Sequence, residues 1–178
     1  MTVLLDRDQL RRAFELMARL LARRGLVCQV YVFGGSAMVL TFDERASTRD
    51  VDSRYTSTSD VDSVAAEVAR RLGLPRSWLD EQASAYLPRT PDDGAVVVYD
   101  STSLTVTRAS VRHLLAMKAD AARPQDADDI RLLAAAMGLS RAEDVAAVHD
   151  ELFPDEPLSE RKLRRIDEAL TGRPLDGT

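Results

Sequence analysis

The spacing of hydrophobic positions changes along this chain. In residues 6–24 they recur every three to four positions until Gly25, which predicts an amphipathic helix. Short apolar or alternating stretches then predict four strands, at 27–33, 50–55, 95–99 and 103–107. Helices are predicted at 36–42 and 60–72. From Ser110 onward the pattern is helical alone, and its last helix is expected at 158–170.

This order of elements predicts an α+β fold with a small mixed, twisted β-sheet flanked by helices and a C-terminal helical region. A chain of 178 residues is long enough for one compact domain with a helical extension. We place the core at 1–108 and the helical region, packed on that core, at 109–178. The stretch 74–91 is predicted to be a loose connector. Trp78 is interpreted as its anchor to the core, with a base-binding face as the alternative.

A glycine pair, Gly34-Gly35, follows the first predicted strand. Glycine tolerates positive φ and has no Cβ, so the backbone can turn sharply and approach a ligand closely. Ser36 then begins a helical segment, and the N-terminus of a helix directs N–H groups and a positive dipole end toward an anion. This stretch therefore predicts a cradle for a triphosphate.

Two carboxylates, Asp50 and Asp52, begin the next predicted strand. A strand's period of two puts both on one face and turns Val51 to the core. Paired carboxylates beside a phosphate cradle are typical of Mg²⁺ sites, where one ion activates the attacking oxygen and another neutralises the leaving pyrophosphate. The same tripeptide recurs at 60–62, where it is interpreted as helix capping behind Ser59.

Composition narrows the possible surroundings and partners. A net charge of -5 argues against a broad basic surface for nucleic acid but allows a local basic track. A single cysteine, Cys28, excludes an internal disulfide and indicates a reducing compartment, so we expect a cytoplasmic protein. No apolar run reaches membrane-spanning length, and no membrane partner is expected. His113 and His149 lack metal-ligand spacing and are interpreted as structural or exposed.

The glycine pair with Ser36 and the Asp50-Val51-Asp52 tripeptide together resemble the signature of minimal nucleotidyltransferases of the DNA polymerase β superfamily. The likeness is greatest to the AbiEii and MenT type toxin branch of bacterial toxin–antitoxin systems. It implies a nucleotidyltransferase-like fold and an enzyme that moves a nucleoside monophosphate from an NTP to an acceptor hydroxyl, releasing pyrophosphate. The implied acceptor is a tRNA 3′ end, and the implied partner is an antitoxin protein. The alternatives are transfer to a protein or small molecule, and a catalytically silent nucleotide-binding module.

The same resemblance implies a second group of site residues. Lys118 matches a lysine that faces the nucleotide phosphates. A downstream catalytic aspartate is matched by both Asp126 and Asp129, with Asp128 as a weaker match. The alternative for Lys118 is a half-buried side chain that reaches from its helix to solvent. For the aspartates it is stabilisation of a helix N-terminus.

The loop before the carboxylates supplies two further candidates. Arg45 is expected to hold either this loop or the phosphates. Thr48 matches a position that a kinase-like antitoxin phosphorylates in some of these toxins, where a phosphate would add negative charge beside the metal site. The alternative is a threonine that bonds the loop. The complete set expected to bind nucleotide is Gly34, Gly35, Ser36, Arg45, Thr48 and Lys118.

One departure from the family pattern concerns the third carboxylate. The fuller polymerase-like pattern takes it from a later strand, but 103–107 offers only leucine, valine, serine and threonine. Asp100, at the end of the preceding strand, is an alternative that acts at a distance. The general base is therefore left unassigned by the sequence.

Overall fold

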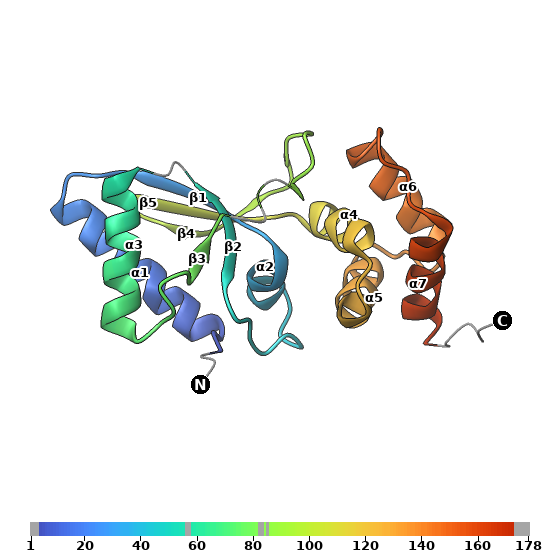
Figure 1. The fold of residues 1–178 in the computed structure, drawn as a ribbon, viewed down its shortest axis with the longest axis horizontal. Coiled ribbons are helices and arrows are strands. Elements are labelled where there is room, and N and C mark those ends of the chain that lie inside the picture. Colours follow the sequence, from blue (N-terminus) through green and yellow to red (C-terminus); the bar gives the residue numbers. More distant parts are fainter. Residues whose placement is uncertain (1–3, 56–57, 82–83, 85, 173–178) are drawn as a thin grey trace. The chain divides into compact units, whose positions relative to one another are not determined.

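The computed structural model describes residues 4–55, 58–81, 84 and 86–172. The chain forms two compact units, one of residues 1–85 and 95–109 and the other of residues 86–94 and 110–178 (Figure 1). The predicted α+β class is confirmed, because a mixed five-stranded sheet is combined with helices and the C-terminal elements are helical. Within the described ranges, no helix is both long and apolar enough to cross a membrane.

The first unit is built on a sheet with the strand order β3-β2-β1-β5-β4. Its elements are α1 (Arg7–Arg23), β1 (Cys28–Val32), α2 (Gly34–Thr41), β2 (Val51–Tyr55), α3 (Ser59–Leu72), β3 (Leu79–Asp80), β4 (Val96–Asp100) and β5 (Leu104–Arg108). β1 is parallel to β5 and antiparallel to β2, and β3 is parallel to β2. The edge strand β3 lies in the stretch predicted to be a loose connector, so that prediction was wrong there.

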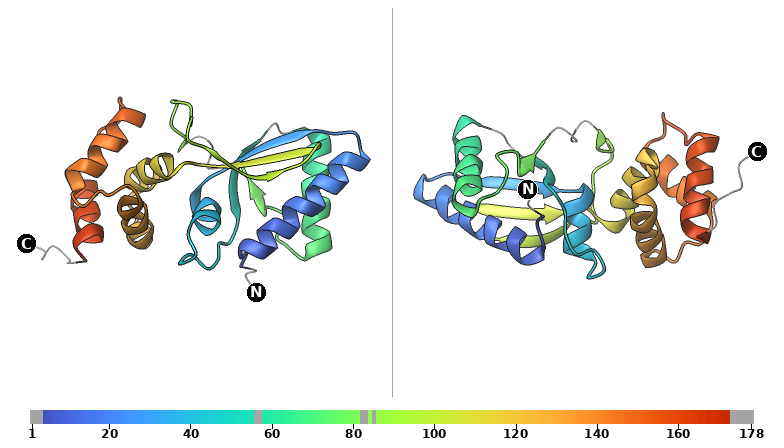
Figure 2. Two further views of the ribbon diagram at one scale, coloured as in Figure 1. Left: turned by 180° about the vertical axis from the view of Figure 1, so that it is seen from behind. Right: turned by 60° about the horizontal axis from the view of Figure 1, so that its bottom comes forward.

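The two faces of the sheet differ in polarity. One face is buried and mainly apolar, and its members include Cys28, Val30, Val32, Val51, Leu104 and Val106. Helices α1 and α3 lie on the same side of the sheet (Figure 2). Phe14 of α1 packs near Tyr99 of β4, with ring centroids 6.5 Å apart. The opposite face carries the alternate side chains, which are mainly polar.

Trp78 anchors the chain between α3 and β3. Its side chain is fully buried, and its indole N–H donates to the carbonyl oxygen of Ala65 in α3 at 2.9 Å. The anchor interpretation is confirmed, and a ring with no exposed surface is not a stacking platform for a base. At the start of α3, Thr58 caps the helix in place of the predicted Ser59, because its side chain accepts from the backbone N–H of Val61.

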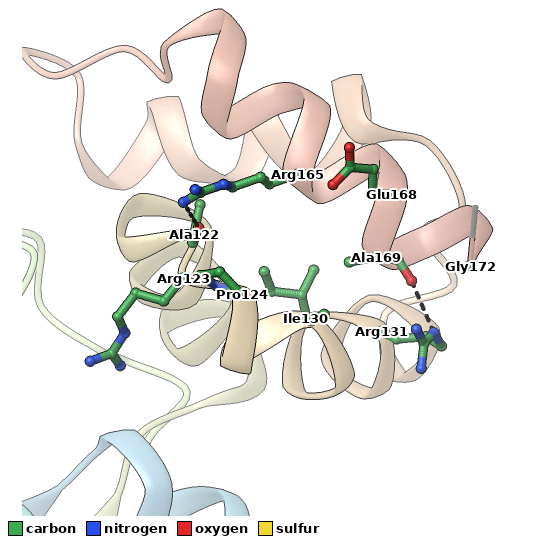
Figure 3. Close-up of a pocket in the computed structure, with 10 residues that line it drawn as sticks. Ala122, Arg123, Pro124, Ile130, Arg131, Arg165, Glu168, Ala169 and Gly172 are labelled. Carbon is green, nitrogen blue, oxygen red and sulfur yellow. Dashed lines mark hydrogen bonds between the residues drawn. The ribbon is translucent and has the colours of Figure 1, made fainter. Parts of the chain in front are cut away.

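The second unit is helical. It contains α4 (Val111–Ala121), the short helix η2 (Pro124–Asp126), α5 (Ala127–Ala136), α6 (Ala142–Leu152) and α7 (Glu160–Thr171). Two arginines satisfy carbonyl oxygens near helix ends (Figure 3). Arg165 donates to Ala122 at 3.0 Å, just beyond α4, and Arg131 donates to Ala169 at 2.9 Å in α7. These bonds tie α7 to α4 and α5.

His113 joins α4 to the loop that precedes β4. Its Nε2 lies 3.2 Å from the carbonyl oxygen of Thr90, and its Nδ1 lies 3.1 Å from a carboxylate oxygen of Asp92. The other Asp92 oxygen accepts from the backbone N–H of Ser110 at 2.8 Å. Burial lowers the pKa of His113, but the bonds with Asp92 and Thr90 outweigh it and raise this pKa above its ordinary 6.5. Because His113 and His149 are both buried, the structural interpretation holds for each.

The raised pKa of His113 predicts a pH dependence of stability. Protonated His113 donates to both Thr90 and Asp92, so the folded state binds this proton more tightly than the unfolded chain does. The stabilisation is fully present below the unfolded pKa of about 6.5 and is lost as the pH rises through the higher folded value. Urea unfolding between about pH 6 and about pH 9 should therefore show a decline in the unfolding free energy of the wild type that His113→Asn lacks. An equal decline in both proteins would contradict this assignment.

Candidate active site

The turn after β1 brings Gly34 against the carboxylate of Asp52. Gly34 has a φ of +61°, in the left-handed region that favours glycine. A Cβ at this position would lie 2.0 Å from Oδ2 of Asp52 and 3.0 Å from its Cγ. Backbone conformation and close approach both require glycine here. Any larger residue at position 34 would displace either the carboxylate or the turn.

Helix α2 begins at this turn. Its N-cap residue, Phe33, makes no side-chain capping bond. Ser36 is buried, and its hydroxyl donates to the carbonyl oxygen of Phe33 at 3.0 Å. The hydroxyl is thus used inside the protein, and the backbone N–H groups of the first turn are the donors that suit an anion.

Asp50 immediately precedes β2 and Asp52 is the second residue of that strand, so the two flank the fully buried Val51. Asp50 is exposed and Asp52 is half-buried, so neither carboxylate lies in the apolar core. That both share one face of a strand stays a prediction. Among the described residues, no group of three or more His, Cys, Asp or Glu side chains is arranged to hold a metal ion. A divalent cation at the pair would therefore draw further ligands from phosphate oxygens or water.

A further carboxylate, Asp80, lies on the neighbouring strand. The parallel pairing of β2 with β3 puts Asp80 beside Asp52, and paired residues project from the same face. Sequence reasoning missed it because β3 has two residues, too few for an alternating pattern. The carboxylate of Asp100, in contrast, accepts a hydrogen bond from the hydroxyl of Thr105 at 2.9 Å. Asp100 is the last residue of β4, which lies three strands from β2. That separation, about 14 Å, puts Asp100 out of reach of Asp52.

Thr48 lies beside Gly35, where a Cβ would be 2.8 Å from its Oγ1. Thr48 is 8% exposed, and its hydroxyl donates to the carbonyl oxygen of Asp50 at 3.1 Å. This contact agrees with the loop-bonding alternative, and phosphorylation, which stays a prediction, would require the loop to open. Arg45 lines a hollow with Arg7 beside the C-terminal end of α2, the end away from the glycine turn.

The second unit contains the other predicted site residues. Nζ of Lys118 lies 2.7 Å from Oδ1 of Asp126 and 2.9 Å from Oδ2 of Asp129. These three side chains are 10%, 2% and 1% exposed. Arg123 is 58% exposed and places its Nε 2.8 Å from Asp126. The two aspartates offered as alternatives therefore bind the same ammonium, whereas Asp128 pairs with Arg131 at the surface.

This cluster of Lys118, Arg123, Asp126 and Asp129 is electrically balanced, with two cations and two carboxylates. Burial raises the pKa of Asp126, but hydrogen bonds from Arg123 and Lys118 outweigh it and hold this pKa below its ordinary 3.8. Lys118 does not reach to solvent as the alternative interpretation had it, since its ammonium ends between two buried carboxylates. The cluster joins α4, η2 and α5, so it has a structural role whatever else it does.

Comparison with known proteins places these features in a family. No curated protein and no solved structure matches the chain significantly. One family model matches residues 8–157, which covers most of the chain and includes both the glycine turn and the Lys118 cluster. That family, DUF6036, is described as a nucleotidyltransferase of unknown function. The match supports the nucleotidyltransferase part of the resemblance and does not extend to the toxin branch. The chain therefore belongs to the DUF6036 family of nucleotidyltransferases.

Proposed function

We propose that the chain transfers a nucleoside monophosphate from an NTP to an acceptor hydroxyl in a Mg²⁺-dependent reaction centred on Gly34, Asp50 and Asp52. The observation that carries the proposal is the approach of Asp52 to Gly34, where a Cβ would meet Oδ2 at 2.0 Å. A carboxylate against the first turn of a helix sets a cation ligand beside anion-binding N–H groups. An NTP bound with Mg²⁺ requires both at once.

The carboxylate pair suits Mg²⁺ by its donor chemistry. Asp50 and Asp52 offer hard oxygen ligands, and the exposed Asp50 is open to an incoming ion. Mg²⁺ bound there would supply Lewis-acid activation of the acceptor oxygen and neutralise charge on the phosphates. The N–H groups of Gly35 and Ser36 would bind phosphate oxygens and orient the α-phosphate. Contact of Lys118 with the phosphates stays a prediction.

The reaction is a displacement at phosphorus. The acceptor oxygen forms a bond to the α-phosphorus, and the bond from that phosphorus to the oxygen bridging the β-phosphate breaks. Pyrophosphate leaves with the bridging oxygen, and the hydroxyl proton passes to solvent water. Orientation and charge stabilisation supply most of the acceleration in phosphoryl-type transfers, which agrees with a site that lacks a third carboxylate on β5.

A tRNA 3′ end is the acceptor that we favour, and the biological role that we favour is the toxin of a toxin–antitoxin pair. Both rest on the motif resemblance of Gly34-Gly35-Ser36 with Asp50-Val51-Asp52, together with the family's description as nucleotidyltransferases. Phosphorylation of Thr48 by a partner antitoxin belongs to the same proposal. These steps extend the chemistry by analogy and are tested separately from it.

The test is incubation of the full chain with Mg²⁺, total bacterial tRNA and each α-labelled NTP in turn. We expect label on tRNA that falls to background in Asp50→Asn/Asp52→Asn, because the variant keeps the side-chain shape but loses the charge that binds the cation. The matched control is Asp60→Asn/Asp62→Asn, which changes the second copy of the tripeptide in the first turn of α3. This control should transfer as the wild type does.

Other outcomes are equally informative. If a protein or a small molecule is labelled instead, and this label is lost in Asp50→Asn/Asp52→Asn, the transferase chemistry is supported and the acceptor is not tRNA. Measurable NTP binding with no labelled product from any acceptor tested would favour the silent nucleotide-binding module. Equal loss of label in both double variants would show that Asp50 and Asp52 have no special role.

A further inference from the structure

A polar hollow of about 380 Å³ lies on the same sheet and is unexplained by the phosphate and metal contacts. Side chains of Gln29, Tyr31, Arg54, Thr105 and Thr107 contribute to its lining. All five alternate with the buried residues of β1, β2 and β5, so they project from the face opposite the apolar core. Asp52 projects from this same face, two residues before Arg54.

The strand register arranges these side chains in two rows. Tyr31 of β1 pairs with Arg54 of β2 on one side and with Thr107 of β5 on the other. Gln29 pairs with Thr105 in the next row. Paired residues on one face lie about 5 Å apart, so the aromatic ring, the guanidinium and the polar groups form one continuous surface.

The chemistry of this surface suits a nucleotide of a single strand. Arg54 is exposed, and among the described residues no carboxylate forms a salt bridge with its guanidinium. Tyr31 is half-buried, and its ring packs toward Phe33 with centroids 6.1 Å apart, which limits its motion. A fixed aromatic ring beside a cation binds a base by stacking and the adjacent phosphate by charge. The amide of Gln29 and the threonine hydroxyls add hydrogen-bonding groups.

The position of the hollow relative to Asp52 favours the acceptor, and not the NTP, as the molecule that binds there. Phe33 donates its backbone N–H to the carbonyl oxygen of Asp52, so these two residues form the row that follows the Tyr31 row toward the glycine turn. Along the strand direction, Asp52 therefore lies between Gly34 and the hollow, about 6.6 Å from the Tyr31 row. Attacking and leaving oxygens stand roughly in line in these displacements. If the pyrophosphate part of the NTP is bound at the glycine turn, the acceptor must approach from the opposite side, where the hollow lies.

We propose that the hollow lined by Tyr31 and Arg54 binds the terminal nucleotide of a single-stranded RNA 3′ end and presents its hydroxyl to the centre at Asp52. The proposal rests on the proposed function for the identity of the reaction, and RNA binding itself requires no turnover. Tyr31 stacks the base and Arg54 binds the neighbouring phosphate. Both are binding residues that fix the acceptor and leave the NTP contacts to the glycine turn.

The experiment measures RNA binding without NTP. The probe is a 5′-fluorescein-labelled single-stranded oligoribonucleotide ending in CCA, and its anisotropy is titrated with the full chain. Tyr31→Ala should weaken binding about tenfold, and Tyr31→Phe should restore it, because the phenyl ring still stacks. Arg54→Gln should weaken binding and lower the slope of log K against log salt by about 0.7.

Two matched controls separate the hollow from general surface effects. Tyr86→Ala removes a tyrosine that is 72% exposed elsewhere, and Arg11→Gln removes an exposed arginine of α1. Both should bind the probe as the wild type does. Circular dichroism and thermal unfolding of each variant confirm that the sheet is intact.

The outcomes distinguish this proposal from the proposed function. If the wild type binds the RNA probe in a Tyr31-dependent way but transfers no nucleotide, the proposed function is contradicted and the RNA-binding site is supported. If transfer is normal but neither Tyr31→Ala nor Arg54→Gln changes binding of the probe, the RNA-binding site is contradicted and the proposed function is supported. A rise in KM for NTP in Tyr31→Ala, with unchanged RNA binding, would assign the hollow to the nucleoside of the NTP and overturn the proposal.

Discussion

Replacement of Gly34 by alanine is expected to reduce nucleotide transfer about 100-fold, because a displacement of about 1 Å at reacting groups has effects of this size. The added Cβ would lie 2.0 Å from Oδ2 of Asp52 and 3.2 Å from its Cβ. The carboxylate must therefore rotate away, or the turn must move. Either movement separates the metal ligand from the helix N-terminus. The measurement is kcat/KM for α-labelled NTP with the acceptor found in the transfer assay.

The control for backbone strain is Gly73→Ala in the same unit. Gly73 has a φ of +66°, close to that of Gly34, but nothing lies within 4 Å of a Cβ there. Both variants should lose about 1–2 kcal/mol of stability from the left-handed conformation, and only Gly34→Ala should lose activity. Full activity in Gly34→Ala would separate Asp52 from the reaction centre. Loss of activity in both variants would attribute the effect to folding of the first unit.

The element pattern along the chain predicted most of the fold because its signals are local. Helix α1 has an apolar face at helical spacing, and Asp6 forms a capping box with Gln9 at its start. In β1 and β5 the buried apolar residues alternate with other side chains, at Cys28, Val30 and Val32 in β1 and at Leu104 and Val106 in β5. In each case the periodicity that stabilises the element is visible in the sequence. The element β3 has no such pattern, since its two residues are fixed by pairing with β2.

The candidate site was predictable only in part. The glycine pair and the two carboxylates are motifs within one short stretch, but the contact of Gly34 with Asp52 depends on how β1 and β2 pair. Asp80 comes beside Asp52 through long-range pairing alone. The Lys118 cluster shows the same limit. Sequence reasoning offered Asp126 and Asp129 as alternatives, whereas the fold brings both to one ammonium.

Replacement of Lys118 by methionine is expected to lower the free energy of unfolding by about 3–5 kcal/mol, the usual effect of removing one partner from a buried ion pair. The variant keeps the apolar stem but leaves Asp129, 1% exposed, without its ammonium. Urea unfolding of the variant and of the wild type at neutral pH measures this loss.

The other lysine of the chain provides the matched control. Lys162 pairs with Asp120 at 2.8 Å, but its side chain is 30% exposed, so Lys162→Met should lose less than about 1 kcal/mol. Lys118→Met/Asp129→Asn should recover part of the stability lost in Lys118→Met, because it also removes the buried carboxylate that the ammonium of Lys118 no longer balances. If Lys118→Met unfolds like the wild type and yet loses transfer, the phosphate-binding role implied by resemblance gains support. If stability and transfer fall together and the second substitution restores both, the primary role of Lys118 is to hold α4, η2 and α5 in one arrangement.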